Sequence, residues 1–265
     1  MMNSSRFGKI LGKPFGRTAL RGYAAIIVFT LLWELCVRLG VPVIGNVPTP
    51  SSVLLSVGGY VSRSEYWQSW AVSMYRVYGG FLAAQVIGIP LGLYMAANRT
   101  GFDLAYPMFE LLRPIPPLAW MPAAVIFWPT NDSSMMFLTF LGAFFPIVLN
   151  IVEGAKSMDK RYVRAALSLG STPRDIFRHI LFPACLPSIV TGMVVGMGAA
   201  WTVVIAAEMI ASSAVGLGQL TWRSFVVGEF PGIIIGMVSI GLAGYLSSAL
   251  IRVLSRYMTP WLYSR

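Results

Sequence analysis

Ionisable side chains inside apolar stretches are the residues of this sequence that could do chemistry. Of its 265 residues, 56% are hydrophobic and only 11% are charged, so a charge within an apolar run stands out. Arg76, Arg113 and Glu208 lie in or beside such runs. An unpaired charge in a membrane is energetically costly, which makes these residues candidates for a functional site. Each can instead be structural, either as a side chain that reaches the membrane surface or as part of an ion pair between helices.

The positions of these charges predict their partners. Arg76 comes immediately before the apolar run 77–97, and Glu208 lies near the end of the apolar run 184–211. With a cytoplasmic N-terminus, both residues fall in the outer leaflet, so we expect them to approach each other near an external gate. Glu110 lies three residues before Arg113 and is its expected partner, because residues three apart on a helix face are neighbours.

Catalytic and metal sites are not indicated. The sequence has no GxxxxGK[ST] loop that would bind ATP and no GxSxG turn that would present a nucleophile. His179 is the one histidine, and Cys36 and Cys185 have no Cys or His companion at the spacing of a zinc site. We therefore predict that the chain is not an enzyme and holds no cofactor or metal. Any ATP-driven work would need a partner that binds ATP and magnesium.

Composition places the chain in a membrane. A mean hydropathy of +0.70 is too high for a soluble domain, and a spanning helix needs about 20 mostly apolar residues. Six apolar runs meet this need approximately: residues 23–39, 77–97, 107–128, 134–152, 184–211 and 233–254. The expected fold is therefore an all-α integral membrane bundle of six helices. A single transmembrane domain would cover residues 23–254, between a basic tail at 1–22 and a short tail at 255–265.

The distribution of basic residues predicts the orientation. With a cytoplasmic N-terminus, 15 of the 20 lysines and arginines fall in cytoplasmic segments, as the positive-inside rule requires. Much of the net charge of +10 is then explained by membrane topology, without nucleic acid. We expect a multi-pass protein of a bacterial-type inner membrane, in contact with lipid and with both termini in the cytoplasm.

The third apolar run has an unusual composition. Pro114, Pro116, Pro117 and Pro122 fall within nine residues, and each proline removes a backbone donor and obstructs the preceding turn. Irregular backbone at membrane depth is tolerated only against protein or a water-filled cavity. The segment is thus a candidate lining of a translocation path, with a kinked packing helix as the alternative.

Other residues could line the same path. Trp120 lies in the proline-rich segment, Trp201 and Thr202 lie in the fifth run, and Asn150 lies in the fourth. Aromatic residues in membrane helices often serve packing or interfacial anchoring instead.

The longest polar segment, residues 163–188, predicts two short helices joined at Gly170. Ser171 or Thr172 can cap the second helix, and Pro173 suits its first turn. Apolar Phe177 falls on a different face from Arg174 and Arg178. An ordinary cytoplasmic connection would have the same features.

This segment also resembles a motif of a known family. Arg164-Ala165-Ala166, then Gly170, then the stretch that ends at Pro183 are similar to the EAA loop of ABC importer permeases. In that family the loop, here about residues 153–183, is a coupling helix that contacts the cytoplasmic ATPase. The resemblance implies a type I ABC importer permease fold and ATPase-coupling roles for the following residues: Arg164, Ala165, Ala166, Gly170, Pro173, Arg174, Phe177, Arg178 and Pro183. Arg164 departs from the pattern, since the family has an acid there.

Three further stretches resemble the permeases that serve taurine, alkanesulfonates, nitrate and related anions. They are Arg113 to Pro122, Ala206-Ala207-Glu208-Met209-Ile210 and Gly216-Leu217-Gly218. The resemblance implies a path for a small anion delivered by an extracytoplasmic binding protein, with taurine or a sulfonate favoured over nitrate or bicarbonate. It also implies a second permease copy, most simply an identical one. From the charges, prolines and aromatic residues of the apolar runs, we expect the following residues on the path: Arg76, Arg113, Pro116, Trp120, Trp201 and Glu208. The alternative is an ion-coupled secondary transporter, with Glu208 as its candidate coupling residue.

Overall fold

The computed structural model describes residues 17–42, 47–211 and 215–258, and all regular elements in these ranges are helical. In chain order they are α1 (Arg17–Arg38), α2 (Pro50–Val61), α3 (Ser64–Ala97), α4 (Arg99–Leu112), α5 (Met121–Phe127), α6 (Asn131–Lys156), α7 (Lys160–Ser168), α8 (Pro173–Ile176), α9 (Phe182–Ile210), α10 (Leu217–Val227) and α11 (Phe230–Met258). A 3-10 turn at Pro117–Trp120 precedes α5, and a π-helical segment at Phe177–Leu181 joins α8 to α9. Most of the predicted tails, residues 1–16 and 259–265, lie outside the described residues.

Five of the described helices are long and apolar enough to cross a membrane: α1, α3, α6, α9 with its α8 extension, and α11. They correspond to five of the six predicted spans. The start of α3 was predicted too late, at residue 77 instead of Ser64, because the extra turns carry charged and polar residues that lower the mean hydropathy.

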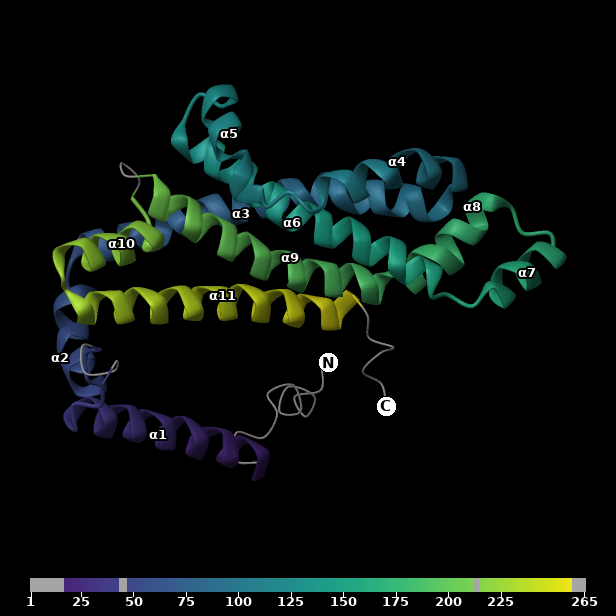
Figure 1. The fold of residues 1–265 in the computed structure, drawn as a ribbon. Coiled ribbons are helices and arrows are strands. Elements are labelled where there is room, and N and C mark those ends of the chain that lie inside the picture. Colours follow the sequence, from purple (N-terminus) through teal and green to yellow (C-terminus); the bar gives the residue numbers. More distant parts are fainter. Residues whose placement is uncertain (1–16, 43–46, 212–214, 259–265) are drawn as a thin grey trace, which may run out of the picture.

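The third predicted span, 107–128, is not one helix. α4 ends at Leu112, and the chain then passes through Pro114, Pro116 and Pro117 before α5 starts at Met121. The irregular backbone expected from the prolines is therefore confirmed, while a continuous spanning helix is wrong. The broken segment still returns the chain from the end near α4 to the opposite end near α5, so the direction of the chain alternates as a six-span topology requires (Figure 1).

The core consists of α3, α6 and α9, with α6 packed against both of the others. Small residues allow this close approach. A Cβ added to Gly192 of α9 would lie 3.1 Å from the Cα of Ile147, and one added to Gly196 would lie 3.1 Å from the carbonyl oxygen of Ala143. Gly192 and Gly196 are four residues apart, and such pairs of small residues commonly allow close helix contacts in membranes.

The remaining helices frame one side and one end of this core. α11 runs along α9 and α10, and α2 packs against α11. α1 stands apart from the bundle and reaches it through α2 (Figure 1). The carboxylate of Glu34 in α1 accepts hydrogen bonds from the backbone N–H of Ser51 at 3.0 Å and from its hydroxyl at 2.8 Å.

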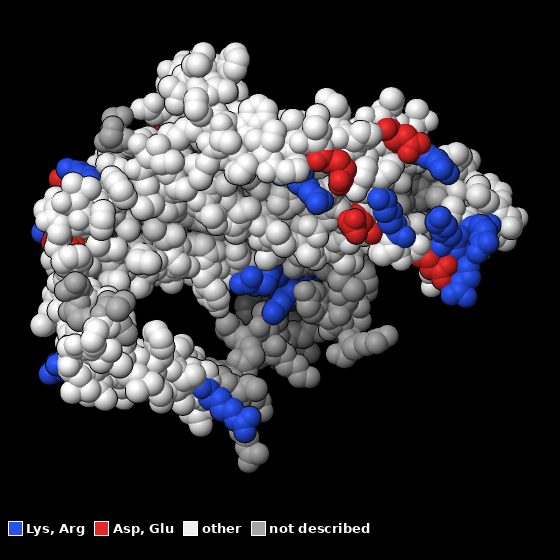
Figure 2. Space-filling view, viewed as in Figure 1, with Lys and Arg blue, Asp and Glu red and all other residues white. Residues whose placement is uncertain are grey.

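Charged side chains lie toward the two ends of the long helices. Figure 2 shows a broad uncharged region beside the edge occupied by α2 and α10, and charged side chains that lie from the middle of the view to the end occupied by α7 and α8. α1 begins and α11 ends on the side of the molecule that carries α7 (Figure 1). This arrangement suits a bundle that crosses a bilayer.

Candidate functional site

A network of charged and polar groups lies between α3, α6, α9 and the start of α10. Arg76 donates from Nη1 to Oε1 of Glu208 at 2.7 Å, and from Nε and Nη2 to Oδ1 of Asp132 at 2.8 and 2.6 Å. The Arg76 side chain is 4% exposed and that of Glu208 is 0% exposed, whereas Asp132 is 49% exposed. The predicted approach of Arg76 to Glu208 is confirmed. Its expected place near an external gate remains a prediction.

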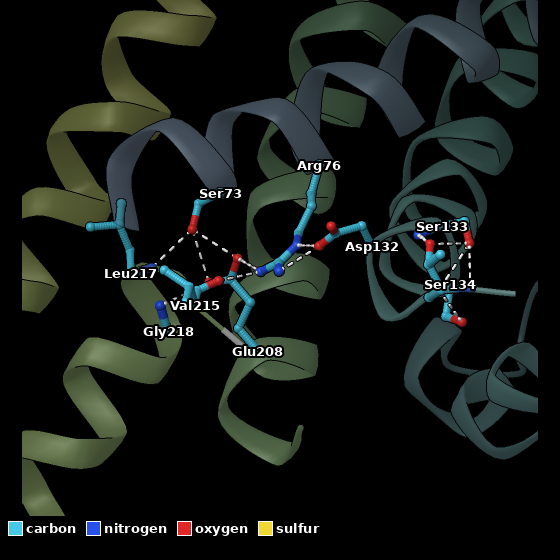
Figure 3. A network of polar contacts seen from close by, with 10 residues as sticks. Ser73, Arg76, Asp132, Ser133, Ser134, Glu208, Val215, Leu217 and Gly218 are labelled. Carbon is cyan, nitrogen blue, oxygen red and sulfur yellow. Dashed lines mark hydrogen bonds and ion pairs between the residues drawn. The ribbon is translucent and has the colours of Figure 1, made fainter. Parts of the chain in front are cut away.

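Neutral donors complete the coordination of the Glu208 carboxylate. Ser73 donates its hydroxyl to both carboxylate oxygens, at 2.8 and 2.9 Å, and the backbone N–H of Gly218 donates to Oε2 at 2.9 Å. The Ser73 oxygen in turn accepts from the backbone N–H of Leu217 at 2.9 Å. In Figure 3 the carboxylate of Glu208 lies between Ser73, Arg76 and the backbone at Gly218. A buried carboxylate is tolerated when it is paired and fully hydrogen-bonded, as here.

The sequence of each element explains how these groups meet. Ser73 and Arg76 are three residues apart on α3 and therefore lie on the same face. The chain after α9 turns back over Glu208, so that the first backbone N–H groups of α10 find acceptors on Ser73 and Glu208. This turn needs Gly216, because a Cβ there would collide with the Glu208 carboxylate.

The network ties four segments together through one guanidinium group. Arg76 also donates to the carbonyl oxygen of Val215 at 2.6 Å. One cation thus holds the start of α6, the end of α9 and the segment before α10 against α3. These groups hold no nucleophile or metal-ligand set, and the described residues contain no cluster of three His, Cys, Asp or Glu side chains that could bind a metal. The arrangement is suited to fixing helix positions.

Asp132, Ser73 and Val215 were not predicted. Asp132 lies in a polar run at the start of α6, where an acidic residue is also favoured by the helix dipole, so its type alone does not reveal a buried partner. Ser73 sits in a helix that also contains Ser69, whose hydroxyl donates to the carbonyl of Glu65 in the same helix; the residue type therefore does not separate the two roles. Val215 contributes a carbonyl oxygen, which no side-chain pattern can indicate. The glycines at 216 and 218 are the sequence feature that could have indicated a close approach of this segment to Glu208.

The other predicted path residues are spread over the molecule. Arg113 is exposed and pairs with Glu110 at 3.7 Å, as predicted. Pro116 is exposed in the turn before α5, and Trp120 is half-buried against α6 and α9. Trp201 is 4% exposed and donates from Nε1 to the hydroxyl of Ser247 at 3.2 Å.

The path roles of these residues stay predictions. Trp201 packs between α9 and α11, because its ring is enclosed and its donor is used, so it does not face an open passage in this conformation. Arg76 and Glu208 are likewise enclosed. Thr202 is exposed on another face of α9 and bonds to the carbonyl of Gly198, and Asn150 bonds within α6 to the carbonyl of Pro146.

The predicted coupling segment forms a projection built from α7 and α8. α7 ends in a left-handed turn at Gly170, with φ of 82°, and the N–H of Ser171 donates to the carbonyl of Ala166. Thr172 caps α8 through a reciprocal pair of hydrogen bonds with Asp175, and Pro173 begins the helix. The predicted corner, cap and first turn are confirmed.

The second helix of this projection is not short, in contrast to the prediction. α8, the π-helical segment and α9 form one helix over Pro173–Ile210. The N–H of Phe182 reaches the carbonyl of Phe177, five residues earlier, and this wider turn leads into Pro183 at the start of α9 without a break. A push on α8 would therefore act directly on α9.

The projection exposes both basic and apolar side chains. Leu169 at its tip is 87% exposed, and Tyr162 and Leu167 are also exposed. Of the nine predicted coupling residues, six are exposed and three, Ala166, Phe177 and Pro183, are half-buried; the exposed ones are Arg164, Ala165, Gly170, Pro173, Arg174 and Arg178. α7 extends beyond the long helices (Figure 1) and makes no extensive contact with another described element.

Comparison with known proteins identifies the family. Residues 88–263 match the model of the binding-protein-dependent transport system inner membrane component. The protein MJ0413 of Methanocaldococcus jannaschii, assigned as an ABC transporter permease, is 38% identical over 87% of this chain and 88% of its own length. The taurine transport system permease protein TauC of Escherichia coli is 31% identical over 94% of this chain and 92% of its own. The nitrate import permease protein NrtB of Synechocystis is 33% identical over 91% of this chain and 90% of its own.

A solved structure shares the fold. The MetNI methionine ABC transporter in an inward-facing conformation aligns with a TM-score of 0.53 at 18% identity, over 78% of this chain and 99% of that one. The fold is therefore that of a type I ABC importer permease. With the match of residues 88–263 to the family model, the chain belongs to the inner-membrane permeases of ABC importers.

Proposed function

We propose that this chain is the permease subunit of an ATP-driven importer for a small anion, with taurine or an alkanesulfonate as the favoured substrate and nitrate or bicarbonate next. The observation that carries the proposal is the α7–α8 projection. It is basic, partly apolar and without a covering element, and it continues into a helix that crosses the bundle. Such a surface fits a separate subunit that supplies the force.

The substrate class is supported by the relatives. Their names assign taurine to TauC, nitrate to NrtB and bicarbonate to CmpB, at 30–33% identity over most of this chain. All three substrates bear an anionic oxygen group. The order of preference among them rests on the sequence resemblance alone.

The family and the predicted topology support the following assembly. Two copies of the chain would enclose the path in the lipid bilayer, and each would offer one projection to one copy of a cytoplasmic ATPase. ATP and magnesium would bind to that partner, and this chain would hold no cofactor or metal. An extracytoplasmic binding protein would deliver the anion to the opposite end. Both termini of the permease would be cytoplasmic.

Closure of the two ATPases would move the projections toward each other. Because α8 is continuous with α9, the movement would tilt α9. Glu208, near the other end of α9, would transmit this tilt to α3 through its ion pair with Arg76. The path would then alternate between inward and outward access.

Ion coupling is less well supported. A coupling carboxylate has to gain and lose a proton or a sodium ion during the cycle. Glu208, the candidate, already accepts hydrogen bonds from Arg76, Ser73 and Gly218. These donors already occupy both oxygens of its carboxylate in this structure.

The test is purification of the tagged chain from its native membrane, followed by identification of co-eluting proteins and assay of ATP hydrolysis in lipid. We expect a P-loop ATPase to co-elute, and hydrolysis to rise when a binding protein loaded with taurine is added. Nitrate-loaded and bicarbonate-loaded binding proteins are the substrate controls. Elution of the chain alone, with transport driven by an ion gradient, would overturn the proposal.

A further inference from the structure

A cavity of about 400 Å³ lies between the end of α2, the start of α3 and α10. Its inner wall is polar but carries no charge, and it includes the buried residues Tyr60, Tyr66, Ser69, Gln219 and Ser224. Burial raises the pKa of the Tyr60 hydroxyl above its ordinary value, so this group stays neutral at physiological pH. The interior is therefore suited to polar or charged groups brought by another molecule.

Four charged residues surround the mouth of this cavity. Arg63, Glu65, Arg223 and Glu229 are all exposed and carry both signs of charge. Within the part of the chain that the structure describes, none of the four belongs to an ion pair. The Arg63 guanidinium lies over the Tyr60 ring, 5.1 Å from its centre. Unpaired charges of both signs can read the orientation of a partner surface.

The cavity ends against the buried network. Val215 and Gly216 form part of its wall. On their other side, the Val215 carbonyl accepts from Arg76, and Gly216 covers the Glu208 carboxylate. Figure 3 shows the Val215 to Gly218 segment in contact with Ser73, Arg76 and Glu208. The cavity is thus a recess closed by the network, which favours a docking site over a stretch of the substrate path.

We propose that this recess receives side chains of the extracytoplasmic binding protein, and that residues 215–218 transmit its occupancy to Arg76 and Glu208. The inference rests on the proposed function, which provides both the partner and the orientation. A folded partner would place an acidic group near Arg63 and Arg223 and a basic group near Glu65 and Glu229. Its contact with Val215 would then act on the segment that holds α3 and α9 together.

Two variants test the docking step. Arg223→Glu reverses a charge at the mouth, and Gln68→Trp fills the mouth from an exposed position of α3. Arg99→Glu is the matched control, because Arg99 is 95% exposed in α4, outside the recess. Each complex is reconstituted with the binding protein that stimulates the wild type. The dissociation constant and the fold-stimulation of hydrolysis, relative to each variant's own basal rate, are measured.

We expect both recess variants to raise the dissociation constant about tenfold or more, because like charges across an interface are strongly disfavoured and a filled mouth excludes the partner. Arg99→Glu should leave it unchanged. A wild-type complex that no binding protein stimulates would overturn the proposed function and the recess together. A stimulated wild type with both recess variants equal to it would overturn the recess alone.

Ser73→Ala tests the transmission step. This change removes the hydroxyl that joins the Leu217 N–H to Glu208 and leaves the mouth of the recess untouched. We expect the dissociation constant to stay within about twofold of the wild type while the fold-stimulation of hydrolysis decreases. Equal stimulation in Ser73→Ala and wild type would contradict transmission through residues 215–218.

Discussion

Glu208 is a fully buried carboxylate whose position in the helix bundle depends on its partners. We expect Glu208→Ala to lower the free energy of unfolding by about 3–5 kcal/mol, because it leaves the buried Arg76 without its enclosed counter-charge. Asp132→Asn should cost about 1 kcal/mol or less, since Asp132 is 49% exposed and water can replace its contact. Denaturant titration of the purified permease measures both changes. Equal losses for the two variants would contradict this difference between the two carboxylates.

Gly218 packs closely against α9, and this contact can be tested. A Cβ at this position would approach the carbonyl oxygen of Ile205 and lie 2.9 Å from the Cβ of Glu208. Gly218→Ala should therefore push α10 away from Glu208 and lower the melting temperature by several degrees, which corresponds to about 1–3 kcal/mol of overpacking. Gly198→Ala in α9 is the control, because nothing lies within 4 Å of its added Cβ. A Gly218→Ala variant that melts with the wild type would rule out the close packing.

The charges of the network differ in how far the sequence reveals them. Arg76 and Glu208 were predicted as a pair because each interrupts or borders an apolar run, where a lone charge demands a partner. Asp132 was missed because acidic residues are common at helix starts for a local reason. The backbone donors of Leu217 and Gly218 have no side-chain signature at all.

At the scale of elements, α8 and α9 form one continuous helix that connects the projection to the network. Arg174 and Arg178 near its start are exposed and make no ion pair with the described residues. We expect the double variant Arg174→Glu, Arg178→Glu to reduce the amount of ATPase that co-purifies by about tenfold. A partner surface that is complementary to these basic residues would repel the acidic replacements. Arg252→Glu, another exposed arginine, serves as the control.

Measurement of this effect should be repeated at two salt concentrations. Coulombic attraction between exposed charges weakens with ionic strength, so the wild-type complex should lose ATPase as salt rises. Undiminished co-purification of the double variant would remove these two arginines from the contact. It would leave the apolar tip at Leu169 as the remaining part of the projection able to bind the partner.

Hydropathy located the long helices but not their ends. The runs at 134–152 and 233–254 lie within α6 and α11, since apolar helices in a bundle keep a nearly uniform composition. α3 begins about three turns before its apolar run. These first turns are polar, and their contacts with α10 and α11 stabilise them as helix. The proline-rich segment broke the third run into α4, a turn and α5, which the prolines indicated and the mean hydropathy concealed.

At the scale of the whole molecule, the fold has a charged, protruding end and a recessed end. The first contains α7 and α8, and the second contains the recess beside α10. The distribution of basic residues predicts that the first end lies in the cytoplasm. If α3, the α4–α5 segment and α6 each cross the membrane, residues 63 and 169 lie on opposite sides of it. Labelling of single cysteines at these two positions can test this topology.

Leu169→Cys and Arg63→Cys are suitable probe positions in a variant whose own Cys36 and Cys185 are replaced by alanine. Both probe sites are exposed. Cys185 is buried, so its replacement by the smaller alanine removes core contacts, and transport by the cysteine-free variant is measured first. A membrane-impermeant maleimide should label Arg63→Cys in intact cells, and it should label Leu169→Cys only after the membrane is opened. The reverse pattern would invert the topology and place the projection outside, where no ATPase could reach it. Labelling of both sites in intact cells would mean that the broken segment of α4 and α5 does not return the chain across the bilayer.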